Sequence, residues 1–114
     1  MAGQARAALD YKITLLEIER EVSGAHFQAS YVYTFQISKV LLTTRGAVVL
    51  TNGGAEIIEK RGLDPIDTAR AVLRKILESG RDPFETEIFL RVPIEYAESF
   101  SQHGNFDGLP GLVE

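Results

Sequence analysis

Residues that could carry chemistry are few in this chain, and none of them belongs to a reaction-specific motif. The two histidines, His26 and His103, stand far from each other and from any carboxylate motif, so their spacing is not that of metal ligands. Cysteine is absent, which excludes a thiol nucleophile and a thiolate metal site. We therefore expect no catalytic residue, no metal and no cofactor, and a protein that is not an enzyme.

One candidate binding segment is Asn52-Gly53-Gly54, which follows an apolar run and precedes good helix formers. Backbone N–H groups at the start of a helix can hold an anion, so Asn52, Gly53 and Gly54 form a candidate anion site. The segment matches neither the dinucleotide fingerprint nor the P-loop, and paired glycines also mark ordinary turns. Because Asn-Gly is a hairpin signal as well, residues 55–61 could form a helix or a strand.

Charged side chains form two further groups. Glu17, Glu19 and Glu21 alternate along the first predicted strand and would share one face, which we expect to be an ordinary exposed face rather than a divalent-cation site. A second group on a predicted helix consists of arginines with acidic neighbours three or four residues away, so we expect a solvated mixed-charge face rather than a phosphate site. These arginines are Arg70, Arg74 and Arg81.

The most regular pattern lies between Val22 and Ala55, where Lys39 and Arg45 are the only Lys, Arg, Asp or Glu residues. Aromatic and polar residues alternate with the two-residue period of a β-strand. A strand face that meets water usually carries charge, because charge protects strands against pairing with other chains. The polar row should therefore be covered, by a ligand or by a second copy of the protein. This predicted ligand or interface surface is His26, Gln28, Ser30, Val32, Thr34 and Gln36.

Hydrophobic periodicity predicts the elements that position this row. A change of parity after Leu15 indicates a bulged first strand, and Ser23-Gly24 marks a hairpin turn into the aromatic strand. The polar residues 43–46 indicate another turn, and residues 86–92 form the last strand. Pro93 ends that strand.

The clearest helix covers about residues 65–79. Asp64 is placed to cap it, Pro65 fits its first position, and apolar residues recur at three- and four-residue spacing. Residues at this spacing form an apolar stripe along one side of the helix. The stripe needs an apolar surface to pack against, and the aromatic face of the strand supplies one. We therefore predict an α+β fold: a mainly antiparallel sheet of four or five strands, with one principal helix at about 65–79 packed on its aromatic face.

Length and composition predict a single α+β domain over residues 1–100, followed by a loosely ordered acidic tail over residues 101–114. The sequence has neither a signal-peptide core nor an apolar run long enough to span a bilayer, so we expect a cytoplasmic protein with no membrane partner. The net charge of −4 arises within residues 95–114, which leaves a neutral body without the basic footprint of a nucleic-acid binder.

These observations favour a small non-enzymatic binding or regulatory module that acts as a homodimer, with an unidentified ligand or protein partner. The order of three strands, a helix and another strand is similar to that of antitoxin-type domains, which gives a nucleic-acid-associated protein as the alternative. A third hypothesis is an enzyme that combines His26 with carboxylates across a subunit interface. No family is assigned from the residues.

Overall fold

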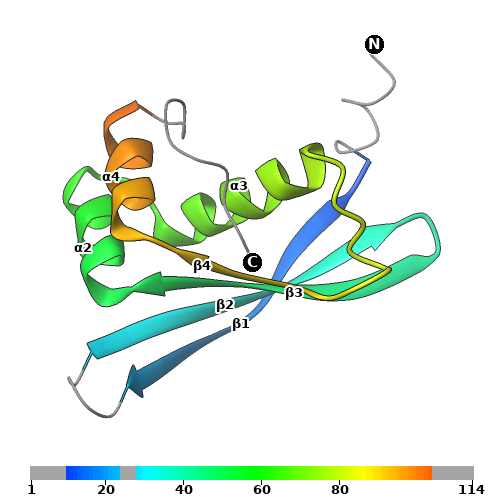
Figure 1. The fold of residues 1–114 in the computed structure, drawn as a ribbon, viewed down its shortest axis with the longest axis horizontal. Helices are drawn as coiled ribbons and strands as arrows, with labels where there is room; N and C mark the ends of the chain where they lie inside the picture. Colours follow the sequence, from blue (N-terminus) through cyan, green and yellow to red (C-terminus); the bar gives the residue numbers. More distant parts are fainter. Residues whose placement is uncertain (1–9, 24–27, 104–114) are drawn as a thin grey trace.

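The computed structural model describes residues 10–23 and 28–103, which form one sheet and three helices (Figure 1). The sheet has four strands in the order β1-β2-β3-β4. The strands are β1 (Lys12–Ser23), β2 (Gln28–Lys39), β3 (Leu42–Thr51) and β4 (Ile88–Val92). The helices are α2 (Asn52–Lys60), α3 (Pro65–Glu78) and α4 (Ile94–His103).

The sheet is mostly antiparallel. β1, β2 and β3 run antiparallel to one another, whereas β4 is parallel to β3. A parallel neighbour requires a crossover connection, and α2 and α3 provide it on one side of the sheet (Figure 1). The predicted α+β class and mainly antiparallel sheet are thus confirmed, and the sheet has four strands where four or five were predicted. Three helices, rather than the predicted single principal helix, occupy that side.

The hydrophobic core lies between the helices and one face of the sheet. Burial alternates along β4, so that its even-numbered residues face the helices and its odd-numbered residues face away. In β2 the odd-numbered residues Tyr33, Phe35 and Ile37 face the helices. The core residues from the strands and α3 are Ile13, Tyr33, Phe35, Ile37, Val48, Leu50, Ile88, Leu90, Val92, Ala69, Val72, Leu73 and Leu77.

The predicted bulge in β1 is confirmed. The β1–β2 register shifts between Leu15 and Glu17, so that Leu15 lies opposite Phe35 and Ile18 lies opposite Tyr33. Both of these β1 residues therefore share the helix side of the sheet, although strict alternation would place Leu15 and Ile18, which are three positions apart, on opposite sides. The bulge turns the following glutamates towards the other side.

The predicted turn at residues 43–46 is wrong, because β2 and β3 are joined by the two residues Val40 and Leu41. Thr43 and Arg45 are polar because they lie at exposed positions of β3, not because they form a turn. Gly46 is a strand residue that makes room for the core, since a Cβ there would lie 3.0 Å from Cδ1 of Ile37.

The helix starts follow the sequence signals. The Thr51 hydroxyl accepts a hydrogen bond of 3.0 Å from the Gly54 N–H, and this cap begins α2 and resolves residues 55–61 as mainly helical. The Asp64 carboxylate accepts a hydrogen bond of 2.9 Å from the Ile66 N–H, as predicted for the start of α3. At the other end of the chain, α4 extends to His103, past the predicted domain boundary at residue 100, and the rest of the predicted tail lies outside the described residues.

Tyr33 should make the free energy of unfolding depend on pH above pH 10. Burial, followed by the negative charges of Tyr31, Glu59 and Asp64, raises the pKa of the Tyr33 phenol from 10.0 to about 12. The folded state then holds this proton more tightly than the unfolded chain, so the stabilisation is complete below pH 10 and is lost as the pH rises through 12. Urea unfolding at a series of alkaline pH values should show a shallower decline for Tyr33→Phe than for the unmodified protein. Equal declines would contradict this expectation.

Candidate functional site

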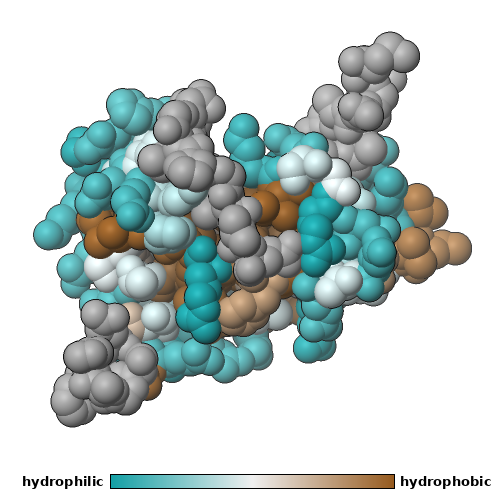
Figure 2. Space-filling view, viewed as in Figure 1, coloured by the Kyte–Doolittle hydropathy of each residue, from teal (hydrophilic) through white to brown (hydrophobic). Residues whose placement is uncertain are grey.

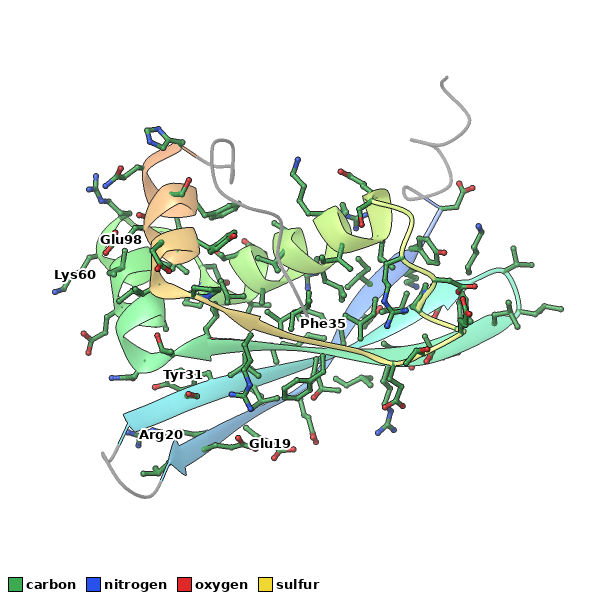
Figure 3. All side chains as sticks on the ribbon, viewed as in Figure 1. Glu19, Arg20, Tyr31, Phe35, Lys60 and Glu98 are labelled. Atoms are coloured by element: carbon green, nitrogen blue, oxygen red, sulfur yellow. The ribbon has the colours of Figure 1, made fainter. Side chains whose placement is uncertain are left out.

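The sheet face that points away from the helices is the candidate site, and we call it the open face. None of the described helices covers it, and Figure 3 shows Glu19 on this side of the sheet. The strand register defines its central residues. They are Glu17, Glu19 and Glu21 of β1, Ser30, Val32, Thr34 and Gln36 of β2, Arg45, Ala47 and Val49 of β3, and Phe89 and Arg91 of β4.

The predicted ligand or interface row lies on this face as far as the structure describes it. Ser30, Thr34 and Gln36 are half-buried, and Val32 is only 9% exposed. The Gln36 Nε2 group donates a hydrogen bond of 3.2 Å to the Ser38 hydroxyl, which holds both side chains along the face. His26 and the side chain of Gln28 lie outside what the structure describes. The row therefore has the predicted orientation, and its binding role stays a prediction.

One row of paired residues across the open face has charges of opposite sign at its two ends. Glu19 lies opposite Val32, Val32 lies opposite Val49, and Val49 lies opposite Arg91. This row therefore runs from an acidic residue on β1, through two valines, to a basic residue on β4. The guanidinium carbon of Arg91 lies 5.5 Å from the ring centroid of Phe89, so its side chain extends along the face.

The three glutamates of β1 repel one another. The pKa of the Glu19 carboxyl is raised above its ordinary value, first by a hydrogen bond with the Glu17 carboxyl and then by the charge of Glu17, partial loss of solvent and the charge of Glu21. None of the three forms an ion pair with a residue that the structure describes. Within residues 10–23 and 28–103 there is also no group of three His, Asp or Glu residues that could hold a metal ion. An opposite charge supplied from outside would therefore be favourable here.

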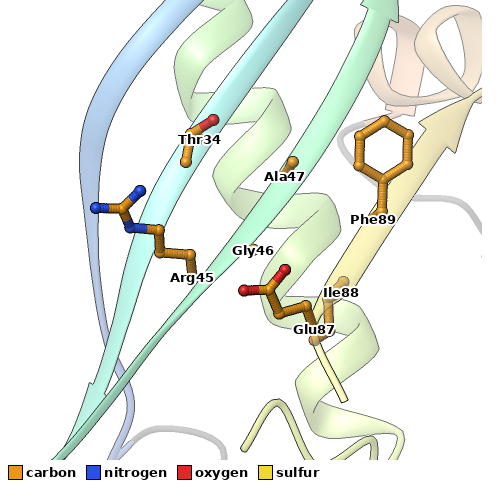
Figure 4. A pocket seen from close by; sticks show the side chains of 7 residues that line it. All are labelled: Thr34, Arg45, Gly46, Ala47, Glu87, Ile88 and Phe89. Carbon is orange, nitrogen blue, oxygen red and sulfur yellow. The ribbon is translucent and has the colours of Figure 1, made fainter.

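A shallow hollow of about 230 Å³ opens on the same face, where β2 and β3 meet the start of β4 (Figure 4). It offers a cation, a carboxylate, a hydroxyl and an aromatic ring, of which the Phe89 ring is 46% exposed. Arg45 and Glu87 form no ion pair with each other or with another described residue. The hollow is lined by Thr34, Arg45, Gly46, Ala47, Glu87, Ile88 and Phe89.

The sequence predicts the β2 row of this site and the shared face of the three β1 glutamates, but not the parts from β3 and β4. The predicted turn at residues 43–46 contains Arg45, and no local pattern connects Phe89 and Arg91 to the polar row of β2. A signal for the last two was present, because they alternate with the apolar residues Ile88, Leu90 and Val92 of the predicted last strand. The sequence does not specify that β4 pairs with β3, and this pairing is what brings Phe89 and Arg91 onto the same face as the β2 row.

The predicted anion site, Asn52, Gly53 and Gly54, forms the first turn of α2. Cβ atoms at the two glycines would lie 3.6 Å from Cδ1 of Ile94 and 3.5 Å from Cβ of Ala97, respectively. Both distances are ordinary van der Waals contacts, and the tightest contact of a Cβ at Gly54 would be 3.2 Å to the capping hydroxyl of Thr51. The start of α2 therefore lies against α4, and anion binding at this turn stays a prediction.

The arginines of α3 and of the segment that follows it interact within the chain. Arg70 forms an ion pair of 3.2 Å with Asp67, and its guanidinium carbon lies 5.7 Å from the ring centroid of Phe35. The Arg81 guanidinium donates a hydrogen bond of 2.7 Å to the backbone carbonyl of Asp82. The mixed-charge helix face predicted from the sequence is thus confirmed for Arg70.

Comparisons of this chain with protein-family models, with curated proteins and with solved structures find no match. In the part of the chain that the structure describes, no helix is long and apolar enough to cross a membrane.

Proposed function

We propose that this protein is a small non-enzymatic binding module that acts as a homodimer through its open face. The observation that supports this proposal is an apolar strip formed by half-buried Ala47 on β3 and exposed Phe89 on the edge strand β4. Glutamates line β1 on the far side of the face, and charged side chains, among them Arg45 and Arg91, lie beside the strip. Apolar surface with a polar rim is typical of protein–protein interfaces. Symmetric dimers are the commonest soluble oligomers, and in them one patch meets itself.

The shape of the face favours a protein partner over a small ligand. Sites for small molecules are concave, with volumes of roughly 300–1,000 Å³, and enclose most of the ligand. The hollow beside Phe89 is smaller, at about 230 Å³, and opens onto a broad sheet. A second sheet can cover this face over its whole width, because sheets pack face to face.

Edge-to-edge pairing of two sheets is less favourable for this molecule. Of the two edge strands, β4 has only 5 residues, and the bulge of β1 between Leu15 and Glu17 interrupts the row of backbone groups that another strand would use. Its three glutamates would also approach those of a second β1. The open face is therefore the better candidate for self-association.

Sedimentation velocity at tens of micromolar protein tests the proposal, and we expect a dimer. Phe89→Asp and Thr34→Glu should each raise the dimer dissociation constant by at least about tenfold, because a charge would be stripped of water within the interface. Both side chains are at least partly accessible, so the fold should tolerate the changes. Val32 is unsuitable for this purpose, since at 9% exposure a charge there would also test the stability of the monomer.

Leu63→Asp provides a matched control. Leu63 follows α2 and is 40% exposed, close to the 46% of Phe89, but it does not belong to the open face. We expect this variant to dimerise like the unmodified protein. A monomer in the unmodified protein, or equal weakening by Leu63→Asp and Phe89→Asp, would contradict the proposed function.

A further inference from the structure

Two neighbouring rows across the open face have the same asymmetry. The first row is Glu19, Val32, Val49 and Arg91, in the order β1 to β4. The second row is Glu17, Thr34, Ala47 and Phe89 in the same order. In both rows the acidic residue lies on β1, the two central residues are small or branched, and β4 carries a cation or an aromatic ring. Within these two rows the face is polarised across the strands, and Glu87 lies outside them, directly before β4.

This polarity distinguishes the two simplest ways of stacking two copies of the face. A two-fold axis parallel to the strands, between β2 and β3, places β1 of one copy over β4 of the other and β2 over β3. A two-fold axis in the same plane but perpendicular to the strands places β1 over β1 and β4 over β4. Both arrangements are symmetric dimers in which the same patch meets itself.

The two arrangements have opposite electrostatic consequences. With the axis perpendicular to the strands, the three glutamates of each β1 would meet those of the partner, which is unfavourable because they already repel one another within one chain. With the axis parallel to the strands, Glu19 of each copy faces the partner's Arg91, which gives two equivalent contacts between opposite charges. Val32 then faces the partner's Val49. Complementary charges across an interface fix its register and suppress other arrangements.

We infer that two copies of this chain pack open face on open face with their two-fold axis parallel to the strands, so that Glu19 of each copy lies opposite the partner's Arg91. This inference rests on the proposed homodimer and specifies its geometry. The second row adds Thr34 against the partner's Ala47 and Glu17 beside the partner's Phe89. The partner is thus a second copy whose glutamates meet the arginine side of the face.

The arrangement also fixes where the two β2–β3 turns lie. A rotation about an axis parallel to the strands leaves each residue at its own height along that axis, so both turns lie at the same end of the dimer. Packed sheets are about 10 Å apart, and with the usual angle between them the two turns should be roughly 10–20 Å apart. With the axis perpendicular to the strands, the turns would lie at opposite ends, separated by roughly the 40 Å length of a twelve-residue strand.

Exchange of the two charges provides the first test. Glu19→Arg and Arg91→Glu should each raise the dimer dissociation constant by at least about tenfold, because each creates two like-charge contacts. The double variant exchanges the charges and should restore the constant to within about threefold of that of the unmodified protein. Both residues are exposed, so circular dichroism should show an unchanged fold. Glu56→Arg on α2 makes the same charge change away from the face and should leave dimerisation unaltered.

A distance measurement provides the second test and leaves the interface untouched. The sequence contains no cysteine, so Leu41→Cys creates a single labelling position, and Leu41 is 95% exposed at the turn. A spin label on this residue in each copy should give an intermolecular distance of roughly 10–20 Å by the geometry above. A distance near 40 Å would overturn the inference.

The outcomes separate this inference from the proposed function. A monomeric unmodified protein would overturn both. A dimer that is disrupted by Phe89→Asp, but in which the double charge variant is no better than either single variant, would retain the proposed homodimer and overturn the arrangement. A dimer insensitive to Phe89→Asp as well would have its interface elsewhere and would again overturn both.

Discussion

Leu73→Ala should lower the free energy of unfolding by about 2–5 kcal/mol, the range for a leucine removed from a well-packed core. Leu73 lies in the middle of α3 and is fully buried, at 0% exposure. Its Cδ1 atom lies 3.5 Å from where a Cβ on Gly46 would be, so the leucine reaches the backbone of β3 at a position without a side chain. Truncation would therefore leave a cavity that glycine cannot fill.

Urea denaturation measures this loss, and Lys75→Ala on the same helix is the control. Lys75 is exposed, and its substitution should change the free energy of unfolding by no more than about 0.5 kcal/mol. A loss below about 1 kcal/mol for Leu73→Ala would mean that the surrounding side chains collapse into the space or that α3 does not pack on the sheet as described.

The helices show how far hydrophobic periodicity can predict this fold. The stripe of α3 was found from spacing, and Ala69, Leu73 and Leu77 are buried as that stripe requires. Val72 is also fully buried, whereas Ile76 is only partly buried. Periodicity within one helix gives the apolar direction but not its neighbours, and here α2 and α4 share the same side of the sheet.

The open face shows a different limit. The polar row of β2 was predictable because a strand alternates with period two. The partners of that row depend on long-range pairing, which no local pattern specifies: β4 joins β3, and this places Arg91 on the side of the face away from Glu19. Had β4 paired with β1 instead, the acidic and basic side chains would be neighbours within one chain.

The β2–β3 turn was missed because its residues lack turn chemistry. Two-residue hairpin turns favour glycine or asparagine, since their backbone requires positive φ angles. Here the turn is Val40-Leu41, and Val40 has a φ of 54°. Positive φ is rare for a β-branched residue and is a strained conformation. The apolar turn residues are almost fully exposed, at 93% for Val40 and 95% for Leu41, and Figure 2 shows apolar surface at this end of the molecule.

Val40→Gly should therefore raise the free energy of unfolding, by about 1 kcal/mol. A left-handed backbone costs a residue with a Cβ atom roughly 1–2 kcal/mol. The gain from removing this cost exceeds the roughly 0.5–1 kcal/mol by which glycine favours the unfolded chain through its extra entropy. Because the Val40 side chain is 93% exposed, its loss removes almost no packing. Chemical denaturation of the variant and of the unmodified protein under identical conditions measures the gain.

Leu41→Gly is the matched control, because it removes an equally exposed apolar side chain from the neighbouring position. Among the described non-glycine residues only Val40 has a positive φ, so Leu41 carries no such strain. Glycine at this position should lower the free energy of unfolding by about 0.5–1 kcal/mol through the entropy of the unfolded chain. A gain in the free energy of unfolding for Val40→Gly and a loss for Leu41→Gly would locate the strain at Val40. Losses of equal size in the two variants would contradict the strain at Val40. Strained residues concentrate at functional sites, and the proposed dimer would bring two such exposed apolar turns to one end.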